Sequence, residues 1–353
     1  MRKARITRKA KKVIKISNSG KNISSGALSV ALCTYNGGAY LQEQLESIAA
    51  QTLPPAELVV CDDGSTDNTM ALIRDYARRA PFAVRLYDNE HRLGVIANYS
   101  RAVSLCRGDY IALCDQDDLW CPEKLELSLD CMRGAEERYG QKTPLMVHSD
   151  LQVVDLQGRI MAASLMKSQN IHHVEDEPLK TLLAQNFVTG CTVLLNRPLA
   201  EAALPLPEKA LMHDWWFALV ASVLGRIVFL PRPTVSYRQH GGNTVGAKKF
   251  ISVKSASRLA RVKELEHTIA RTVEQGLALL DRLEQRGTAA LPPYLAGYLK
   301  AARQNGKEAA AYARSHGITK QGRLRRFVFL LLLARGRYLE YLEENCAAER
   351  NYC

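Results

Sequence analysis

The sequence has 353 residues, 47% of them hydrophobic, so it is long enough to fill a sizeable core. It carries 48 Lys and Arg against 36 Asp and Glu, and the net charge of +12 favours anionic partners such as phosphorylated substrates, nucleic acid or acidic lipid. The nine cysteines include no CxxC pair, so we expect reduced thiols in a cytosolic protein and neither a disulfide framework nor a zinc finger. No apolar stretch reaches the roughly 20 residues of a membrane-spanning helix.

The first 26 residues are rich in Lys and Arg and lack the apolar core of a signal peptide, so we expect a basic flexible arm there. Residues 27–249 alternate short apolar runs with stretches of helical periodicity, which is typical of an α/β protein with helices on both faces of a mostly parallel sheet. The expected strands are Leu28–Cys33, Glu57–Cys61, Val84–Tyr87, Tyr110–Cys114, Leu145–Asp150, Cys191–Asn196 and Arg226–Leu230. Ligands of such open sheets bind beyond the carboxyl ends of the strands.

Strand patterns end near residue 250, and we expect a C-terminal helical region over 250–353. Apolar residues recur every three or four positions from Leu259 to Leu280, which predicts a long amphipathic helix, and Pro292 and Pro293 predict a break after it. Further on, the basic run 323–326 leads into the apolar segment Phe327–Ala334. This segment is either a helix packed on the rest of the protein or an amphipathic helix in a membrane interface. Together with the basic arm, it makes an anionic membrane surface a candidate partner.

Three strand-end loops carry polar groups suited to chemistry. Asp115–Asp118 follows a buried strand, and a hard divalent cation such as Mg²⁺ or Mn²⁺ would offset the mutual repulsion of its carboxylates; a solvated acidic loop is the alternative. Asp62 and Asp63 follow the second strand, where capping of the next helix explains Ser65 or Thr66 but not the paired aspartates. The segment Thr34–Gly38 combines glycine with short polar groups, which suits a nucleotide-binding loop or a plain turn.

These loops belong to a set of motifs that resembles the family 2 glycosyltransferases. The motifs are CTYNGGAYLQEQLESI, VVCDDGSTDNT, GDYIALCDQDDLW, HDWW and YRQHGGN, in the family's order between about Leu28 and Val245. The resemblance implies the GT-A fold, a Rossmann-like sheet that binds nucleotide-diphospho-sugars, in residues 27–249. It implies an inverting, metal-dependent transfer of one sugar to a hydroxyl of a glycan or lipid-linked glycan acceptor. The Gln-x-x-Arg-Trp motif and the membrane helices of processive members do not occur here, which favours single addition.

Within the family, CTYNGGAYLQEQL, DQDDLW and YRQHGGN look most like bacterial rhamnosyltransferases. This implies dTDP-rhamnose or a UDP-hexose as the donor, and a cytoplasmic hexosyltransferase of bacterial surface polysaccharide assembly that is peripheral on the inner face of the plasma membrane if it binds lipid. Many relatives have Ala-Arg-Asn where this chain has Ile96-Ala97-Asn98, so the arginine of that motif is missing.

The resemblance also assigns roles to single residues. Asp63 would accept a hydrogen bond from the imide N–H of a uracil or thymine ring, with Asp62 supporting the loop. The full set implied to bind the nucleotide-sugar is Thr34, Tyr35, Asn36, Asp62, Asp63, Asn98, Asp115 and Arg238. Asp117 would be the main ligand of the metal, with Asp115 and His240 beside it. Asp214 matches the catalytic base, and the N-terminus of a helix also favours a negative charge at this position.

Three other functions remain open. A sugar nucleotidyltransferase has similar nucleotide chemistry, but its Gly-rich loop contains Arg and is followed by a downstream Lys, and CTYNGG has neither. A nucleic-acid-binding protein would explain the charge, but the basic residues gather in the tails without aromatics between them, so nucleic acid is not the expected partner. An inactive binder of nucleotide-sugars is the third, and the presence of Asp63, Asp117 and Asp214 argues against it.

Overall fold

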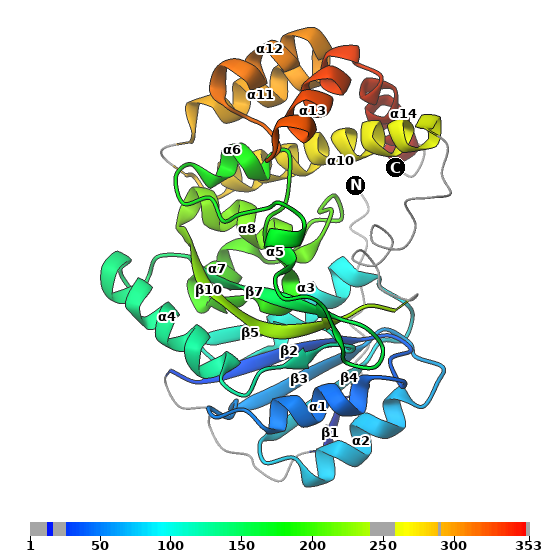
Figure 1. The fold of residues 1–353 in the computed structure, drawn as a ribbon, viewed down its shortest axis with the longest axis vertical. Helices are drawn as coiled ribbons and strands as arrows, with labels where there is room; N and C mark the ends of the chain where they lie inside the picture. Colours follow the sequence, from blue (N-terminus) through cyan, green and yellow to red (C-terminus); the bar gives the residue numbers. More distant parts are fainter. Residues whose placement is uncertain (1–12, 17–25, 241–257, 289–290, 351–353) are drawn as a thin grey trace, which may run out of the picture.

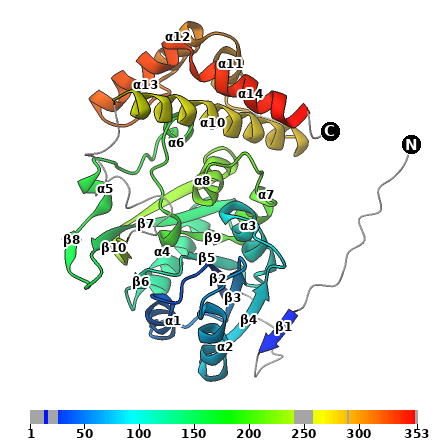
Figure 2. The same ribbon diagram turned by 90° about the vertical axis from the view of Figure 1, so that its right-hand side faces the viewer.

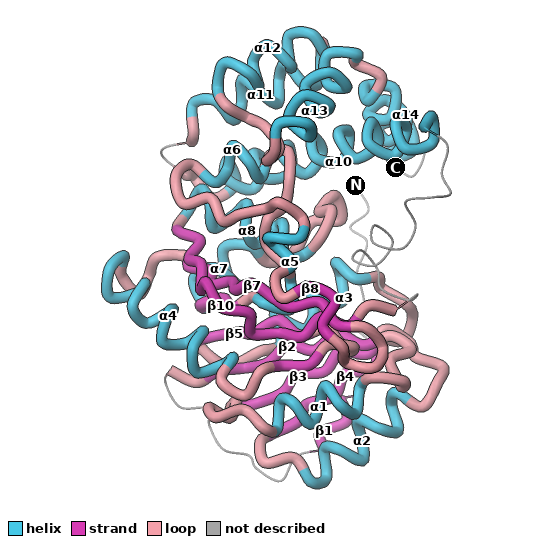
Figure 3. Tube along the Cα trace, viewed as in Figure 1, coloured by secondary structure: helices cyan, strands magenta, loops and turns pink. Residues whose placement is uncertain are grey.

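The polypeptide builds a ten-stranded sheet between layers of helices, with further helices stacked beyond one face (Figure 1; Figure 3). The computed structural model describes residues 13–16, 26–240, 258–288 and 291–350. The strands are β1 (Val13–Ile16), β2 (Leu28–Thr34), β3 (Glu57–Asp62), β4 (Ala83–Asp88), β5 (Tyr110–Cys114), β6 (Leu119–Trp120), β7 (Leu145–Val154), β8 (Ile160–Ala162), β9 (Leu194–Asn196) and β10 (Arg226–Arg238). The helices are α1 (Leu41–Ala49), α2 (Thr69–Arg79), α3 (Val95–Leu105), α4 (Lys124–Tyr139), α5 (Leu165–Ser168), α6 (Pro178–Leu182), α7 (Arg197–Ala203), α8 (His213–Leu224), α10 (Arg258–Gln285), α11 (Pro293–Gln304), α12 (Gly306–His316), α13 (Arg323–Arg335) and α14 (Tyr338–Arg350), with a 3-10 turn η1 at Gly190–Thr192.

The strand order is β1-β4-β3-β2-β5-β9-β7-β10-β6, and β8 pairs with β7. Strands β2 to β5 are parallel neighbours, as are β7 and β10. The expectation of a mostly parallel sheet is wrong for the second half, because β9 lies antiparallel between β5 and β7. The chain leaves β7 at its carboxyl end and re-enters the sheet at that same end, so no crossover reverses it. The carboxyl ends of β2, β3, β5 and β10 therefore share one edge.

All seven expected strands are present. Only β5 has the expected bounds; β2, β3, β4 and β7 are longer by one to four residues, and β9 and β10 differ as follows. Strand β9 starts at Leu194 instead of Cys191, because the 3-10 turn η1 occupies the preceding residues. Strand β10 continues to Arg238, past Pro231 and Pro233. Proline donates no hydrogen bond to a sheet, and the pairing of β10 with β7 shifts register on both sides of Pro233.

The expected flexible arm, residues 1–26, lies mostly outside the described residues. Within it, Val13–Ile16 form β1, which pairs antiparallel with β4 at the edge of the sheet (Figure 2). This short segment is thus a strand within the expected arm. Its β-branched Val and Ile residues favour a strand, and the Lys between them is typical of an edge.

Side chains of the central strands alternate between two cores. Val30 and Leu32 of β2 pack toward α1, α2 and α4, whereas Ala31 packs toward α3, α7 and α8. The strands β3 and β5 repeat this pattern, and β2, β3 and β5 are almost wholly buried. Helices therefore cover both faces of the sheet, as the sequence predicts.

The C-terminal helices α10 to α14 stack on the α8 side of the sheet (Figure 1; Figure 2). The long helix expected around Leu259–Leu280 is α10, and α11 begins at Pro293, at the expected break. Buried residues of α10, such as Leu279 and Leu283, belong to the same core as α8. Within the described part of the chain, no helix is both long and apolar enough to cross a membrane.

Candidate active site

The carboxyl ends of β2 and β3 are joined by Asp62, whose side chain is buried. Its Oδ2 accepts hydrogen bonds from Thr34 Oγ1 and Ser65 Oγ, both at 2.6 Å, and its Oδ1 accepts one from the Ser65 backbone N–H at 2.8 Å. Asp62 thus supports the loop, as the resemblance implies. The Thr34 side chain is buried as well and donates to Asp62. It therefore stabilises the loop and does not point toward the surface.

The carboxylate of Asp63 organises the loop that follows β4. Its Oδ1 accepts from Asn89 Nδ2 at 2.9 Å and from the Leu93 N–H at 2.7 Å, and its Oδ2 accepts from the Gly94 N–H at 2.9 Å. Gly94 has φ +81°, a conformation that strongly favours glycine. Because a carboxylate has about four lone-pair positions, one acceptor position on Oδ2 has no donor among the described residues.

Asn98, on α3, acts behind this loop. Its Oδ1 accepts from Asn89 Nδ2 and its Nδ2 donates to the Cys61 carbonyl, both at 2.9 Å. The side chain is 3% exposed. Asn98 therefore positions Asn89, and through it Asp63, instead of presenting its amide at the surface.

Tyr35 and Asn36 form the outer part of the first loop. The Tyr35 ring is 37% exposed, and the guanidinium of Arg92 lies 3.9 Å from its centroid. Asn36 adopts φ +47°, and its Oδ1 accepts from the Thr66 N–H at 2.8 Å. Arg92 was not singled out from the sequence; its place between Asn89 and Gly94, in the loop wrapped around Asp63, is the only sequence signal for it.

The acidic loop after β5 is fixed by two contacts to its neighbours. Gln116 accepts from the Tyr35 N–H at 2.8 Å and donates to the Tyr35 carbonyl at 3.1 Å, which ties this loop to the first one. Tyr99 donates its hydroxyl to Asp115 Oδ1 at 2.6 Å. Burial, with the charge of Asp117 adding to it, raises the pKa of Asp115 to about 6.

Asp117 and His240 are in direct contact. His240 Nε2 lies 2.7 Å from Asp117 Oδ2, and the Tyr40 ring packs on the imidazole with centroids 4.5 Å apart. Arg238 Nη2 donates to Glu43 Oε2 at 2.6 Å, with the Arg238 side chain almost wholly buried. Arg238 therefore anchors the end of β10 to α1, which brings His240 to the acidic loop. The residues 241–243 of the YRQHGGN motif lie outside the described residues.

A divalent cation fits the donor set of this edge. One oxygen each of Asp115 and Asp118 and the Cys191 sulfur lie within 4.8 Å of one another. Asp118 Oδ2 is buried without a hydrogen-bond donor among the described residues. Carboxylate and imidazole ligands suit Mn²⁺, and carboxylates suit Mg²⁺. Sulfur is a soft ligand, whereas Mg²⁺ and Mn²⁺ prefer carboxylate oxygen, so Asp118 rather than Cys191 joins the expected ligands.

Asp214 lies in the first turn of α8. Its Oδ1 accepts from the Trp215 N–H at 2.6 Å and from Asn186 Nδ2 at 3.2 Å. Burial, and to a smaller extent the charge of Asp115, raises the pKa of Asp214 to about 7. A carboxylate in this state can take up a proton near neutral pH, as a general base must.

Tyr99 and Gly190 connect Asp214 to the acidic loop. The Tyr99 ring stacks on His213 with centroids 3.6 Å apart, while its hydroxyl holds Asp115. A Cβ on Gly190 would lie 2.6 Å from His213 Nε2 and 3.5 Å from Asp214 Oδ2, so only glycine fits beside them. Tyr99 joins segments that local sequence patterns do not connect, and those patterns gave no signal for it.

Comparisons with known proteins find similarity to glycosyltransferases. Residues 29–136 match the model of the family "Glycosyl transferase family 2". An uncharacterised protein of Mycobacterium tuberculosis is 31% identical over 216 residues, which are 60% of this chain and 59% of that protein. The chain thus spans about three fifths of the length of this relative. The dTDP-rhamnosyl transferase RfbG of Shigella flexneri is 26% identical over 238 residues, 63% of this chain and 76% of that protein.

Among solved structures, TarS 1-349 of S. aureus in complex with UDP-GlcNAc aligns with a TM-score of 0.51 at 18% identity, covering 91% of this chain and 92% of that one. This likeness concerns the fold, a mixed α/β sheet followed by a helical region. Together with the order of the strand-end motifs, these comparisons show a glycosyl transferase family 2 region at residues 29–136 and the GT-A fold for the chain.

Proposed function

We propose that this chain is an inverting, metal-dependent hexosyltransferase that moves one sugar from a nucleotide-diphosphate donor to a hydroxyl of a glycan or lipid-linked glycan acceptor. The observation that carries the proposal is a set of aspartates at one edge of the sheet whose contacts and burial differ. Asp63 keeps one acceptor position, Asp117 contacts His240, and Asp214 has a raised pKa. A buried carboxylate with a raised pKa in a site that holds further carboxylates is typical of catalysis.

Asp63 suits a pyrimidine base. A uracil or thymine ring has an imide N–H, and the free acceptor position of Asp63 Oδ2 is a matching partner. The exposed Tyr35 ring and the Arg92 guanidinium offer flat surfaces for the base beside it. We favour dTDP-rhamnose or a UDP-hexose as donor, and the similarity to RfbG, a dTDP-rhamnosyl transferase, supports the first.

Asp115, Asp117 and His240, with Asp118 as a further candidate, would hold Mg²⁺ or Mn²⁺. A bound cation supplies positive charge that stabilises the departing nucleoside diphosphate. The residues that position these ligands are Tyr99 for Asp115 and Arg238 for His240. Tyr99 and Arg238 orient the ligands. Loss of such an orienting residue in a metal site lowers metal affinity or activity by about 10- to 100-fold.

Asp214 is the proposed general base. It takes the proton of the acceptor hydroxyl as the oxygen of that hydroxyl bonds to the anomeric carbon, while the bond from this carbon to the phosphate oxygen breaks and the nucleoside diphosphate leaves. Attack from the face opposite the leaving group gives inversion. Asn186 and the Trp215 N–H orient the carboxylate for this step.

The proposed setting is bacterial surface polysaccharide assembly in the cytoplasm, with a peripheral position on the inner face of the plasma membrane. The similarity to RfbG and the free thiols of the described cysteines are compatible with it. The net charge of +12 favours such an anionic environment.

Nucleotide binding tests the first half of the proposal. The test is a thermal-shift titration of the full chain with UDP, dTDP or GDP, each in Mn²⁺ and in EDTA. UDP or dTDP in the presence of metal should raise the apparent stability of the protein, since a ligand stabilises the state that binds it. Asp63→Asn should weaken this response, because an amide nitrogen can face the imide donor. The exposed Asp130 on α4 provides a matched control, Asp130→Asn. Equal responses to all three nucleotides in the wild type would contradict the pyrimidine assignment.

Nucleoside-diphosphate release from a panel of nucleotide-sugars tests the second half. Asp117→Ala and Asp214→Asn should lose turnover, the latter by about 10²- to 10⁴-fold, which is the usual contribution of a general base. Asp214→Asn should still bind nucleotide, whereas Asp117→Ala should lose the metal-dependent part of binding. Wild-type rates in either variant would remove that residue from the mechanism.

A further inference from the structure

We propose that the outer face of α12 and α13 docks on an anionic lipid surface. This face, the α12–α13 face, comprises the exposed side chains of Leu324, Phe327 and Leu331 and the basic side chains around them. It adds a partner to the proposed function but does not depend on the donor site, so either proposal can fail alone.

Helix α13 has two apolar sides. Phe329, Leu332 and Leu333 are buried in the core, which explains why the helix packs on the protein. Leu324, Phe327 and Leu331 are 75%, 64% and 48% exposed. They follow the spacing i, i+3 and i+7, so they lie on one side of the helix and form a continuous apolar stripe. The sequence left open a packed helix or a membrane-interface helix, and α13 has the features of both.

The surroundings of the stripe are basic. Residues 306–337 contain eight Lys and Arg and a single acidic residue, Glu308. Arg323, Arg326 and Arg335 are exposed on α13, as are Lys307 and Arg314 on α12. Arg325 differs, because it donates to the Gln169 and Asn170 carbonyls and so fastens α13 to the protein. The exposed arginines are therefore available for an anionic partner.

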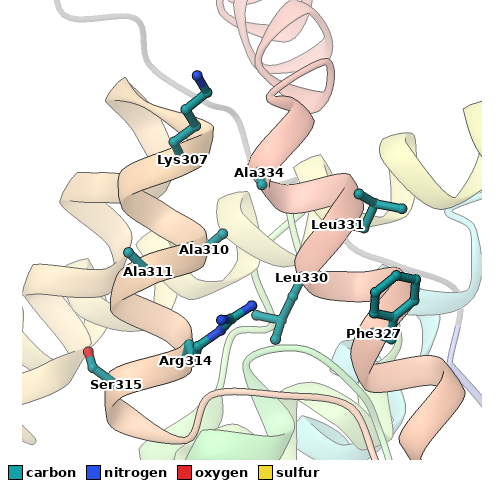
Figure 4. A pocket seen from close by; sticks show the side chains of 9 residues that line it. All are labelled: Lys307, Ala310, Ala311, Arg314, Ser315, Phe327, Leu330, Leu331 and Ala334. Carbon is teal, nitrogen blue, oxygen red and sulfur yellow. The ribbon is translucent and has the colours of Figure 1, made fainter.

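A groove between the two helices continues the apolar stripe (Figure 4). It has a volume of about 520 Å³, with Ala310 and Ala311 on one side and Phe327, Leu330, Leu331 and Ala334 on the other. Lys307 and Arg314 belong to its lining, and Figure 4 shows Arg314 and Leu330 pointing toward each other across the groove. Apolar walls with cationic groups at the rim match an acyl chain and a phosphate headgroup of one anionic lipid.

The charge of the α12–α13 face favours an anionic lipid surface over a second copy of the chain as its partner. A symmetric contact through the α12–α13 face would bring two strongly basic surfaces together, and like charges oppose such a contact. An amphipathic helix with large apolar residues and flanking arginines instead suits the interface of an anionic bilayer, lying in its plane. No described helix is suited to spanning the bilayer, so contact would be peripheral.

Vesicle flotation of the full chain tests the proposal. The wild type should bind vesicles of mixed phosphatidylcholine and phosphatidylglycerol, bind pure phosphatidylcholine weakly, and lose binding with added salt. Arg323→Gln/Arg326→Gln should bind the mixed vesicles about 30-fold more weakly, at about 1 kcal/mol for each charge. Phe327→Ser/Leu331→Ser should bind about tenfold or more weakly, because less apolar area is buried.

Two matched variants serve as controls. Arg133→Gln/Arg138→Gln on α4 makes the same change in net charge, and Ile160→Ser/Met161→Ser removes two apolar side chains of comparable exposure on β8. Both should bind vesicles as the wild type does. Equal loss in a control and in its α13 counterpart would overturn the proposal, and so would unchanged vesicle binding in Phe327→Ser/Leu331→Ser. A loss of self-association in that variant, measured by light scattering, would assign the face to a second copy instead.

Discussion

At the scale of single residues, the site depends on carboxylates whose surroundings differ. Asp62 and Asp63 each accept three hydrogen bonds, but Asp62 joins the loops after β2 and β3, whereas Asp63 holds the loop after β4. Asp214 is buried at the start of α8, where burial outweighs the hydrogen bonds that would keep it ionised. Three aspartate side chains therefore differ in function because their surroundings differ.

The pKa of Asp214 predicts how activity depends on pH. Since a protonated carboxyl cannot accept the acceptor's proton, kcat/KM should rise with pH and reach half of its plateau near pH 7. The raised pKa also means that the folded state holds this proton between pH 3.8 and about 7 while the unfolded chain releases it, so the free energy of unfolding should fall as pH rises through that range. Rate and urea-unfolding profiles would measure both.

The same profiles on variants provide the control. Asp214→Asn should lose the pH-dependent part of the free energy of unfolding that Asp214 contributes, and Asp130→Asn should keep the wild-type profiles. A rate that stays level or falls between pH 6 and 8 would rule out Asp214 as the group that must ionise.

Gly190 allows a prediction from van der Waals contact alone. In Gly190→Ala the new methyl group would meet the His213 ring, and overpacking of this kind costs about 1–3 kcal/mol in the free energy of unfolding. Turnover should fall as well, because His213 adjoins Asp214. Gly134→Ala on α4 is the matched control: no atom lies within 4 Å of its Cβ, and alanine should stabilise the helix by up to about 1 kcal/mol. Equal effects in urea unfolding would contradict the contact.

At the scale of elements, α3 joins the acidic loop to α8 through one side chain. Tyr99 donates its hydroxyl to Asp115 and stacks its ring on His213. Helix α3 therefore positions Asp115, after β5, relative to Asp214, on α8, although it contributes no reacting group itself. Such positioning residues are expected to influence the metal site more than the fold.

Tyr99→Phe separates the hydroxyl from the ring. The stack on His213 remains, so the fold should persist, but Asp115 loses a hydrogen bond that favours its ionised form. The Mn²⁺ concentration needed for half-maximal activity should rise about tenfold or more. Tyr76→Phe is the control, since the Tyr76 hydroxyl is buried without a hydrogen-bond partner among the described residues. An unchanged metal requirement in Tyr99→Phe would show that the hydroxyl does not position Asp115.

The elements also mark how far sequence patterns reach. The strands β2 to β5 and the loops after them were predictable, because buried strands are apolar runs and the acidic motifs directly follow them. The antiparallel β9 was not, since apolar runs carry no information about direction. Tyr99 and Arg92 were missed for a related reason: each acts through contacts between segments distant in sequence. Local periodicity does not encode such contacts.

At the scale of the whole molecule, the C-terminal helices share a core with the sheet domain. Arg282 of α10 donates to the Ala202, Leu204 and Pro205 carbonyls at the C-terminal end of α7, and Gln275 Oε1 accepts from the Leu211 N–H. Apolar burial and these polar contacts together fix the stack. We therefore expect the two parts to unfold as one unit.

Arg282→Ala tests this coupling. Three carbonyl groups would lose their donor, which should lower the free energy of unfolding by about 1–3 kcal/mol and reduce amide-exchange protection in α10 and α7 together. Arg286→Ala, one turn further along and exposed, should have little effect. Loss of protection confined to α10 would mean that the helical region opens independently.

The strand β1 has a consequence for how the protein behaves in concentrated solution. By pairing with β4, it replaces the six-residue edge of β4 with a four-residue edge that carries a lysine, and short edges with Lys pair less readily with a strand from another molecule. A shortened chain that begins at Gly26 would expose the longer edge of β4. We therefore expect such a chain to aggregate more readily.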